Sequence, residues 1–264
     1  MEVRKDLEFR QSLILHKLEM FGSLSVAELA GETGVSEVTL RKDLAELEAR
    51  GLLARIQGGA VSAGSRQTET ELFRHVPHTA NFELKHKVAR TASKLISDGD
   101  SLIVTSGSTP HLTLLYASDK KNLKIVSDSL LIAEDICSRQ DYQTIILGGE
   151  ISTRNHFVHG RDAVRQARKY MADKAILTMD GVDAEAGLTT IRVEGADTLK
   201  SILARARKRI IVADSTKIGV ENFCNIGSIT DADILVTNRT DDPQKCDNLK
   251  RIEQAGVQII YAEQ

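Results

Sequence analysis

The chain has 264 residues, of which 41% are hydrophobic, and its formal net charge is −2 at pH 7. This length suits one large domain and one small domain, and the charge excludes a surface covered with cations, so any nucleic-acid contact must come from a local cluster. Three cysteines without a C-x-x-C pair exclude a disulfide framework, and no apolar run reaches the roughly 18 residues of a membrane span. We therefore expect a soluble, cytoplasmic protein.

The first 61 residues are expected to form a small domain of helices and a hairpin. Apolar residues at helical spacing predict three helices, over residues 7–21, 26–32 and 37–50. Ser25 and Ser36 are the expected N-caps of the second and third helices. A hairpin, here called the wing, follows at 52–61, where Gly58 and Gly59 permit the positive φ of a tight turn. This order of elements predicts a winged helix-turn-helix domain.

The third predicted helix presents residues to the outside. Leu40, Leu44 and Leu47 form its core stripe, which leaves its first turns facing outward, where a recognition helix meets the major groove. Residues 1–61 carry eight Lys and Arg against ten Asp and Glu, so DNA binding would depend on the few cations near this helix and the wing. Few phosphate contacts per subunit predict a homodimer or homotetramer that reads two half-sites. The outward-facing candidates are Val38, Thr39, Arg41 and Lys42.

From Arg10 to Ala60 the chain resembles the DNA-binding head of the DeoR family of repressors. Shared markers include Thr39-Leu40-Arg41-Lys42-Asp43-Leu44 and, in the wing, Gly58-Gly59-Ala60. Without the resemblance, Arg41 and Lys42 would be interpreted as a solvated helix face. The resemblance implies that operator DNA is contacted by Ser36, Val38, Thr39, Arg41 and Lys42 and, in the wing, by Arg55, Gly58 and Gly59.

A linker and a larger domain follow. Residues 62–81 lose periodicity and collect Ser, Gly, Thr and Pro, which predicts a linker. Over residues 82–264, β-rich runs alternate with helical patterns, which predicts an α/β domain with a mostly parallel sheet. The predicted strands are 101–105, 123–127, 144–147, 174–179, 209–213, 233–237 and 257–261.

Polar residues gather where these predicted strands end. Ser106, Gly107, Ser108 and Thr109 lie between a strand and a helix, and backbone N–H groups at such a helix start suit a phosphate. Because open α/β sheets bind ligands at the carboxyl ends of their strands, residues after other strands are also candidates. These are Asp128, Gly148, Gly149, Glu150, Asp180 and Lys217. An ordinary turn or a structural cap is the alternative for each of them.

Residues 82–261 resemble the DeoR sensor domain, whose fold is related to ribose-5-phosphate isomerases and glucosamine-6-phosphate deaminases. The markers include Asp98-Gly99-Asp100, Gly107 with Thr109, Gly187-Leu188-Thr189, and Asp214 with Lys217-Ile218-Gly219. Thr105, Asp128 and Asn238 depart from the family, which usually has Asp, Asn and Asp at these positions. The resemblance implies an effector pocket for a phosphorylated sugar. The three departures lie in or near that expected pocket, so we expect an effector that is unusual for the family.

The combined expectation is a repressor of a carbohydrate-catabolism operon that a phosphorylated sugar releases from its operator. It is not expected to be an enzyme or to need a cofactor. His75-x2-His78 and His156-x2-His159 lack Cys or carboxylate partners, so no metal is expected. A sugar-phosphate isomerase or deaminase with an added head is the alternative, but the glycine-rich catalytic segment expected after 180–183 is missing. A structural scaffold that uses neither the DNA-binding site nor the effector pocket is the third interpretation, and we rank it last.

Overall fold

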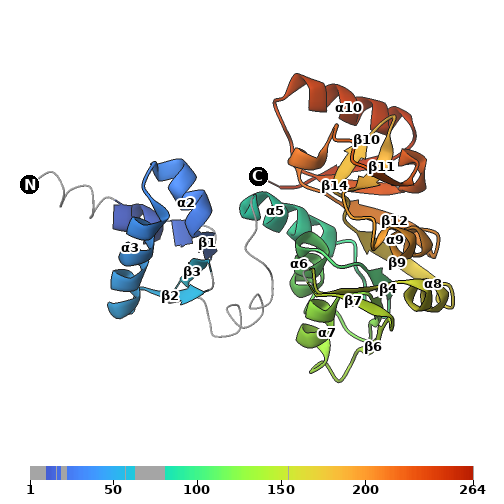
Figure 1. The fold of residues 1–264 in the computed structure, drawn as a ribbon, viewed down its shortest axis with the longest axis horizontal. Helices are drawn as coiled ribbons and strands as arrows, with labels where there is room; N and C mark the ends of the chain where they lie inside the picture. Colours follow the sequence, from blue (N-terminus) through green and yellow to red (C-terminus); the bar gives the residue numbers. More distant parts are fainter. Residues whose placement is uncertain are drawn as a thin grey trace, which may run out of the picture. The chain divides into compact units, whose positions relative to one another are not determined.

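The computed structural model describes residues 10–15, 17–18, 23–56, 58–62, 81–153 and 155–263. The chain divides into two compact units, Met1–Glu83 and Leu84–Gln264, and each is described by itself (Figure 1). Most of the predicted linker, and His75 and His78, lie outside the described residues. No helix in the described ranges is long and apolar enough to cross a membrane.

The N-terminal unit combines helices with a three-stranded antiparallel sheet of order β1-β3-β2. Residues 10–15 and 17–18 are helical, within the first predicted helix. The other elements are β1 (Ser23–Ser25), α2 (Val26–Thr33), α3 (Glu37–Ala49), β2 (Leu53–Ile56) and β3 (Gly59–Ser62). The second and third predicted helices, α2 and α3, and the wing are thus confirmed, whereas β1 was not predicted. The core of the N-terminal unit includes Ile14, Leu18, Leu29, Leu40, Leu44, Leu47 and Leu53.

Gly59 fits the wing for a reason that the sequence did not reveal. It pairs with Ser25 of β1, and a Cβ at this position would lie 2.0 Å from the carbonyl oxygen of Leu24. Gly58 carries the positive φ of the turn, at +85°. The first glycine therefore makes the turn, and the second permits the close approach of β1.

The C-terminal unit is built on a seven-stranded parallel sheet of order β15-β14-β12-β9-β4-β5-β6. Each of the seven predicted strands overlaps one of its members, which confirms the α/β fold. The strands are β4 (Ser101–Val104), β5 (Lys124–Ser127), β6 (Gln143–Ile146), β9 (Ala172–Leu177), β12 (Ala206–Val212), β14 (Ile234–Thr237) and β15 (Gln258–Tyr261).

Helices cover both faces of this sheet (Figure 1). Successive side chains of a strand point to opposite faces, so Ile103 joins one core cluster while Leu102 and Val104 join the other. The Leu102 cluster includes residues of α5 (Phe82–Ser93), α6 (Ser108–Tyr116) and α7 (Leu130–Ile136). The Ile103 cluster includes residues of α8 (Arg161–Ala167), α9 (Ala196–Leu203) and α10 (Pro243–Gln254). The unit is therefore a three-layer α/β/α fold.

Two small antiparallel sheets were not predicted. One pairs β7 (Glu150–Ser152) with β8 (Phe157–His159), and the other joins β10 (Gly181–Asp183), β11 (Gly187–Thr190) and β13 (Cys224–Gly227). Each strand has three or four residues, too few for alternation to stand out in the sequence. Val158, Val182, Leu188 and Ile226 bury these sheets against the Ile103 cluster.

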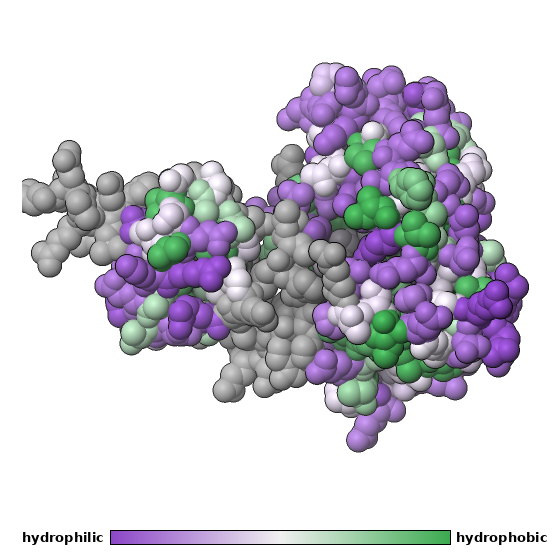
Figure 2. Space-filling model, viewed as in Figure 1, coloured by the Kyte–Doolittle hydropathy of each residue, from purple (hydrophilic) through white to green (hydrophobic). Residues whose placement is uncertain are grey.

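The visible surface of the C-terminal unit is mostly hydrophilic, and hydrophobic residues gather in a few small areas (Figure 2). Among the described residues of this unit, the exposed large hydrophobic side chains are Ile146, Ile151, Met171, Ile191, Val193 and Phe223. Ile191 directly follows Thr190 and Phe223 directly precedes Cys224, the last residue pair of β11 and β13.

Candidate functional site

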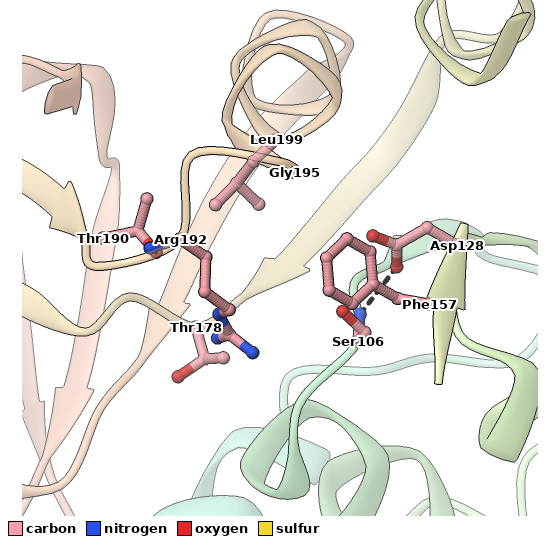
Figure 3. A pocket seen from close by; sticks show the side chains of 8 residues that line it. All are labelled: Ser106, Asp128, Phe157, Thr178, Thr190, Arg192, Gly195 and Leu199. Carbon is pink, nitrogen blue, oxygen red and sulfur yellow. Dashed lines mark hydrogen bonds between the residues drawn. The ribbon is translucent and has the colours of Figure 1, made fainter. Parts of the chain in front are cut away.

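A pocket opens at the carboxyl ends of three neighbouring strands of the parallel sheet. Ser106 follows β4, Asp128 follows β5 and Thr178 follows β9. The pocket and the open solvent at its mouth together span about 380 Å³. Its lining consists of Ser106, Asp128, Phe157, Thr178, Thr190, Arg192, Gly195 and Leu199 (Figure 3).

The position of this pocket follows from the topology of the sheet. The chain leads from β4 to β5 and β6 on one side, and then to β9, β12, β14 and β15 on the other. The strand order therefore reverses between β4 and β9, and open α/β sheets bind ligands at such a switch point. Ser106 and Thr178 follow the two strands that flank it.

The loop between β4 and α6 needs glycine at position 107. Gly107 has a φ of +140°, and a Cβ there would lie 2.6 Å from Cγ2 of Thr178. It occupies the N-cap position of α6 without supplying a side-chain cap, so the first-turn amides of α6 are available to an anion. In that first turn, Ser108 is half-buried and Thr109 is buried.

Asp128 is a buried carboxyl group in the pocket wall, with only 5% of the residue exposed. Its Oδ1 accepts a hydrogen bond of 2.6 Å from the backbone N–H of Ser106, which fixes the start of the loop. Burial raises the pKa of Asp128 to about 7, although the Ser106 N–H opposes the rise. Its protonation therefore changes near neutral pH.

Arg192 brings a positive charge to the pocket and connects it to two predicted residues. Its guanidinium lies 3.6 Å from Oδ2 of Asp180, and Nζ of Lys217 lies 3.9 Å from Oδ1 of the same carboxylate. The hydroxyl of Thr190 donates to Asp180 at 2.7 Å. Asp180 thus connects Arg192, Lys217 and Thr190 in one network beside the pocket.

The structure brings some of the predicted residues together and leaves others apart. Ser106 and Asp128 line the pocket, Gly107 contacts it through Thr178, and Asp180 and Lys217 adjoin it through Arg192. The Gly148–Glu150 segment does not line it. There the backbone N–H of Gly148 donates to Gln166 of α8, and a Cβ at Gly149 would lie 2.4 Å from the carbonyl oxygen of His159.

Sequence reasoning missed six of the lining residues. Thr178 lies at the end of a predicted strand and could have been found, and Thr190 follows a marker of the family resemblance. No motif pointed to the other four, which belong to β8 and to the region from Arg192 into α9: Phe157, Arg192, Gly195 and Leu199.

A second candidate site lies on the outer face of α3 in the N-terminal unit. Ser36 caps the helix, and its hydroxyl accepts a 3.3 Å hydrogen bond from the backbone N–H of Thr39. Val38 is 66% exposed, and Arg41 and Lys42 are also exposed, while Leu40 and its partners in the core stripe are buried. An exposed apolar side chain beside cations suits a groove that offers thymine methyl groups and phosphates.

Two of the predicted DNA-contacting arginines already pair with carboxylates. Arg41 lies 2.9 Å from Glu37, and Nε of Arg55 lies 2.7 Å from Glu48. The backbone N–H of Arg55 also donates to Glu48, and these hydrogen bonds lower the pKa of the Glu48 carboxyl. Both pairs are exposed, and exposed pairs contribute about 0–1 kcal/mol, so a phosphate can replace either carboxylate.

Two family models match the chain. The DeoR-like helix-turn-helix domain matches residues 10–66, and the DeoR C terminal sensor domain matches residues 80–239. The glycerol-3-phosphate regulon repressor of Escherichia coli (strain K12) is 28% identical over 87% of this chain and 90% of its own length. The lactose phosphotransferase system repressor of Streptococcus mutans is 30% identical over 84% and 88%. The repressor GlcR of Bacillus subtilis is 25% identical over 97% of both chains.

Solved structures that resemble the chain include ribose 5-phosphate isomerase A of Neisseria gonorrhoeae. It is 20% identical, with 51% of this chain and 52% of that chain covered and a TM-score of 0.38. A likeness at this level carries no argument about the chemistry of the pocket.

Proposed function

Because the chain belongs to the DeoR family of transcriptional regulators, we propose that it represses a carbohydrate-catabolism operon and leaves its operator when a phosphorylated sugar binds. The pocket at the switch point carries this proposal, since a guanidinium and a carboxyl group line it and its residue Ser106 leads into the N-terminus of α6. The relatives described above are named as repressors, and two of their names refer to glycerol-3-phosphate and to a lactose phosphotransferase system.

The enzyme alternative is not supported. The relatives that match 87% and 97% of this chain are named as transcriptional repressors and not as isomerases or deaminases. The chain is accordingly a regulator, and its pocket has to bind and release a ligand without converting it.

The proposed phosphate position lies where three features of the pocket meet. The amides of Ser108 and Thr109 at the start of α6 are close to Thr178, because the Cγ2 methyl group of Thr178 packs against Gly107. Arg192 lies beside Thr178 in Figure 3. A guanidinium can bind two phosphate oxygens at once, and a helix N-terminus favours the negative charge. Lys217 supports the same site through Asp180.

The two sites are coupled by unequal binding to two states of the protein. A sugar phosphate lowers operator affinity only if it binds the DNA-incompetent arrangement more tightly than the DNA-competent one. Couplings of this kind are typically about 1–3 kcal/mol. The effector therefore changes operator affinity without contacting DNA.

The proposed recognition helix predicts that Arg41→Ala and Lys42→Ala each weaken operator binding. Loss of one base or phosphate contact costs about 1–3 kcal/mol, so we expect an increase of about tenfold or more in Kd. Mobility-shift titrations at fixed salt measure it. Arg165→Ala, which removes an exposed arginine from α8 in the other unit, is the matched control and should bind like the parent. Parental affinity in both head variants would contradict this docking.

The proposed phosphate position predicts that Arg192→Ala and Lys217→Ala act as super-repressors. Operator affinity without effector should stay normal, because both residues lie in the C-terminal unit. A hydrogen bond to a charged group contributes about 1.5–3 kcal/mol, so half-release of Arg192→Ala should need about 10 to 100 times more effector. Lys217→Ala acts through Asp180 and should need more effector than the parent but less than Arg192→Ala. Operator binding titrated with sugar phosphate measures this, with Arg165→Ala again as the control. Release of both variants at the parental effector concentration would place the phosphate elsewhere.

Self-association is part of the proposal, as a homodimer or homotetramer. The exposed apolar side chains of Ile191 and Phe223, which follow and precede the last residue pair of β11 and β13, support an interface there. We expect Phe223→Ser to shift the full chain towards smaller species in sedimentation velocity. A parental distribution for this variant would remove these residues from the interface.

A further inference from the structure

The carboxyl group of Asp128 has no positive partner, although it is buried in the pocket wall. No described Lys, Arg or His side chain lies within ion-pairing distance of it, and the nearest charged group with an effect on it is Arg192. One of its oxygens accepts from Ser106. The other is directed towards the open space of the pocket in Figure 3. A desolvated carboxylate of this kind is costly unless a cation pairs with it.

The cation of the pocket is on the opposite wall. Figure 3 shows Arg192 beside Thr178 on one side, and Asp128, Ser106 and Phe157 on the other. The guanidinium carbon of Arg192 lies 6.0 Å from the centre of the Phe157 ring, so Arg192 and the ring face one another across the cavity. The pocket therefore has a positive wall and a negative wall.

We propose that the effector carries a free amino group as well as a phosphate, and is therefore a phosphorylated amino sugar. Its ammonium pairs with Asp128, and its phosphate meets Arg192 and the α6 N-terminus. This inference rests on the proposed function, which makes a sugar phosphate the ligand of this pocket.

Charge complementarity separates this ligand from its neutral counterpart. A sugar phosphate without an amine brings its negative charge to a cavity whose buried carboxyl group ionises near neutral pH, and its hydroxyls offer that carboxyl group no positive charge. An ammonium at the Asp128 wall supplies both the missing charge and a hydrogen-bond donor. N-acetylation removes the charge and adds bulk, so it should abolish the advantage.

The test compares matched pairs of ligands on the full chain by isothermal titration calorimetry at pH 7. The probes are glucosamine 6-phosphate with glucose 6-phosphate, and galactosamine 6-phosphate with galactose 6-phosphate, together with N-acetylglucosamine 6-phosphate. We expect the amino member of at least one pair to bind ten or more times tighter than its neutral partner. Asp128→Asn should erase that difference without weakening the binding of the neutral member, because it removes the negative charge while an amide oxygen still accepts from Ser106.

Glu194→Gln is the matched control for charge. It removes one carboxylate near the pocket mouth, where Glu194 binds Ser152 at 2.7 Å, without changing a lining residue. Glu194→Gln should keep the parental preference for the amino sugar phosphate over its neutral partner. The inference is overturned if neutral members bind as tightly as amino members, or if Asp128→Asn keeps the preference. A neutral sugar phosphate that binds and releases the operator would leave the proposed function standing, whereas failure of every sugar phosphate to bind would overturn both.

Discussion

Asp128→Asn should raise the free energy of unfolding of the C-terminal unit by up to about 4 kcal/mol at pH 8 and leave it nearly unchanged at pH 4. Burial raises the pKa of Asp128 to about 7 in the folded protein, whereas in the unfolded chain this carboxyl has the ordinary Asp value of 3.8. Each unit of difference corresponds to about 1.4 kcal/mol. The amide cannot ionise and keeps the acceptor for Ser106.

The direction follows from where the proton is bound. Below about pH 4 the carboxyl is protonated in both states, so its contribution to stability is fully present. Between about pH 4 and 7 the unfolded chain releases the proton while the folded chain keeps it, so stability is lost as pH rises. Above about pH 7 the loss is complete. The asparagine variant avoids this loss of stability. The difference in free energy of unfolding between the variant and the parent should therefore grow from pH 4 to 7 and then level off.

Differential scanning calorimetry of the full chain from pH 4 to 8 measures the effect as the difference between parent and variant. Asp233→Asn is a control of opposite sign, because the hydrogen bond from Arg209 lowers the pKa of Asp233. That variant should be less stable than the parent by a nearly constant amount from pH 4 to 8, because the stabilisation of the parent is almost complete once pH exceeds the unfolded value of 3.8. A constant difference between parent and Asp128→Asn over the whole range would show that Asp128 has an ordinary pKa.

Asp43→Ala should destabilise the N-terminal unit by about 3–5 kcal/mol, because it breaks a buried ion pair from one side. Asp43 of α3 binds the guanidinium of Arg10 through both carboxylate oxygens, and the two side chains are 4% and 15% exposed. Without this carboxylate, a mostly buried guanidinium loses its charge partner where water cannot replace it. Because α3 is the proposed recognition helix, operator binding should fail once this unit unfolds.

Thermal unfolding of the full chain, followed by circular dichroism, and operator binding over the same temperatures test this prediction. Glu37→Ala is the matched control: it removes a carboxylate that pairs with Arg41 on the same helix, but both partners are exposed. We expect it to change stability by no more than about 1 kcal/mol. Equal effects of the two variants would mean that the Arg10–Asp43 pair is solvated.

The amino-acid sequence by itself determined the parallel sheet of the C-terminal unit and the helices and wing of the N-terminal unit, but not the short strands. The seven strands of the parallel sheet, α3 with its Ser36 cap and the wing all depend on local signals, namely apolar periodicity, a capping hydroxyl and turn glycines. Such signals act within a few residues, so they can be interpreted without the fold. Ser106 and Asp128 were found for the same reason, since each directly follows a predicted strand.

Only the tertiary structure decided the environment of these residues. The burial that raises the pKa of Asp128 comes from segments far away in the chain, and Arg192 faces the same cavity from a loop that contains no motif. Asp43 lies between Lys42 and Leu44 in the sequence, and its pairing with Arg10 depends on how the helices pack. Burial and charge pairing are properties of packed neighbours, and a single sequence does not state which residues become neighbours.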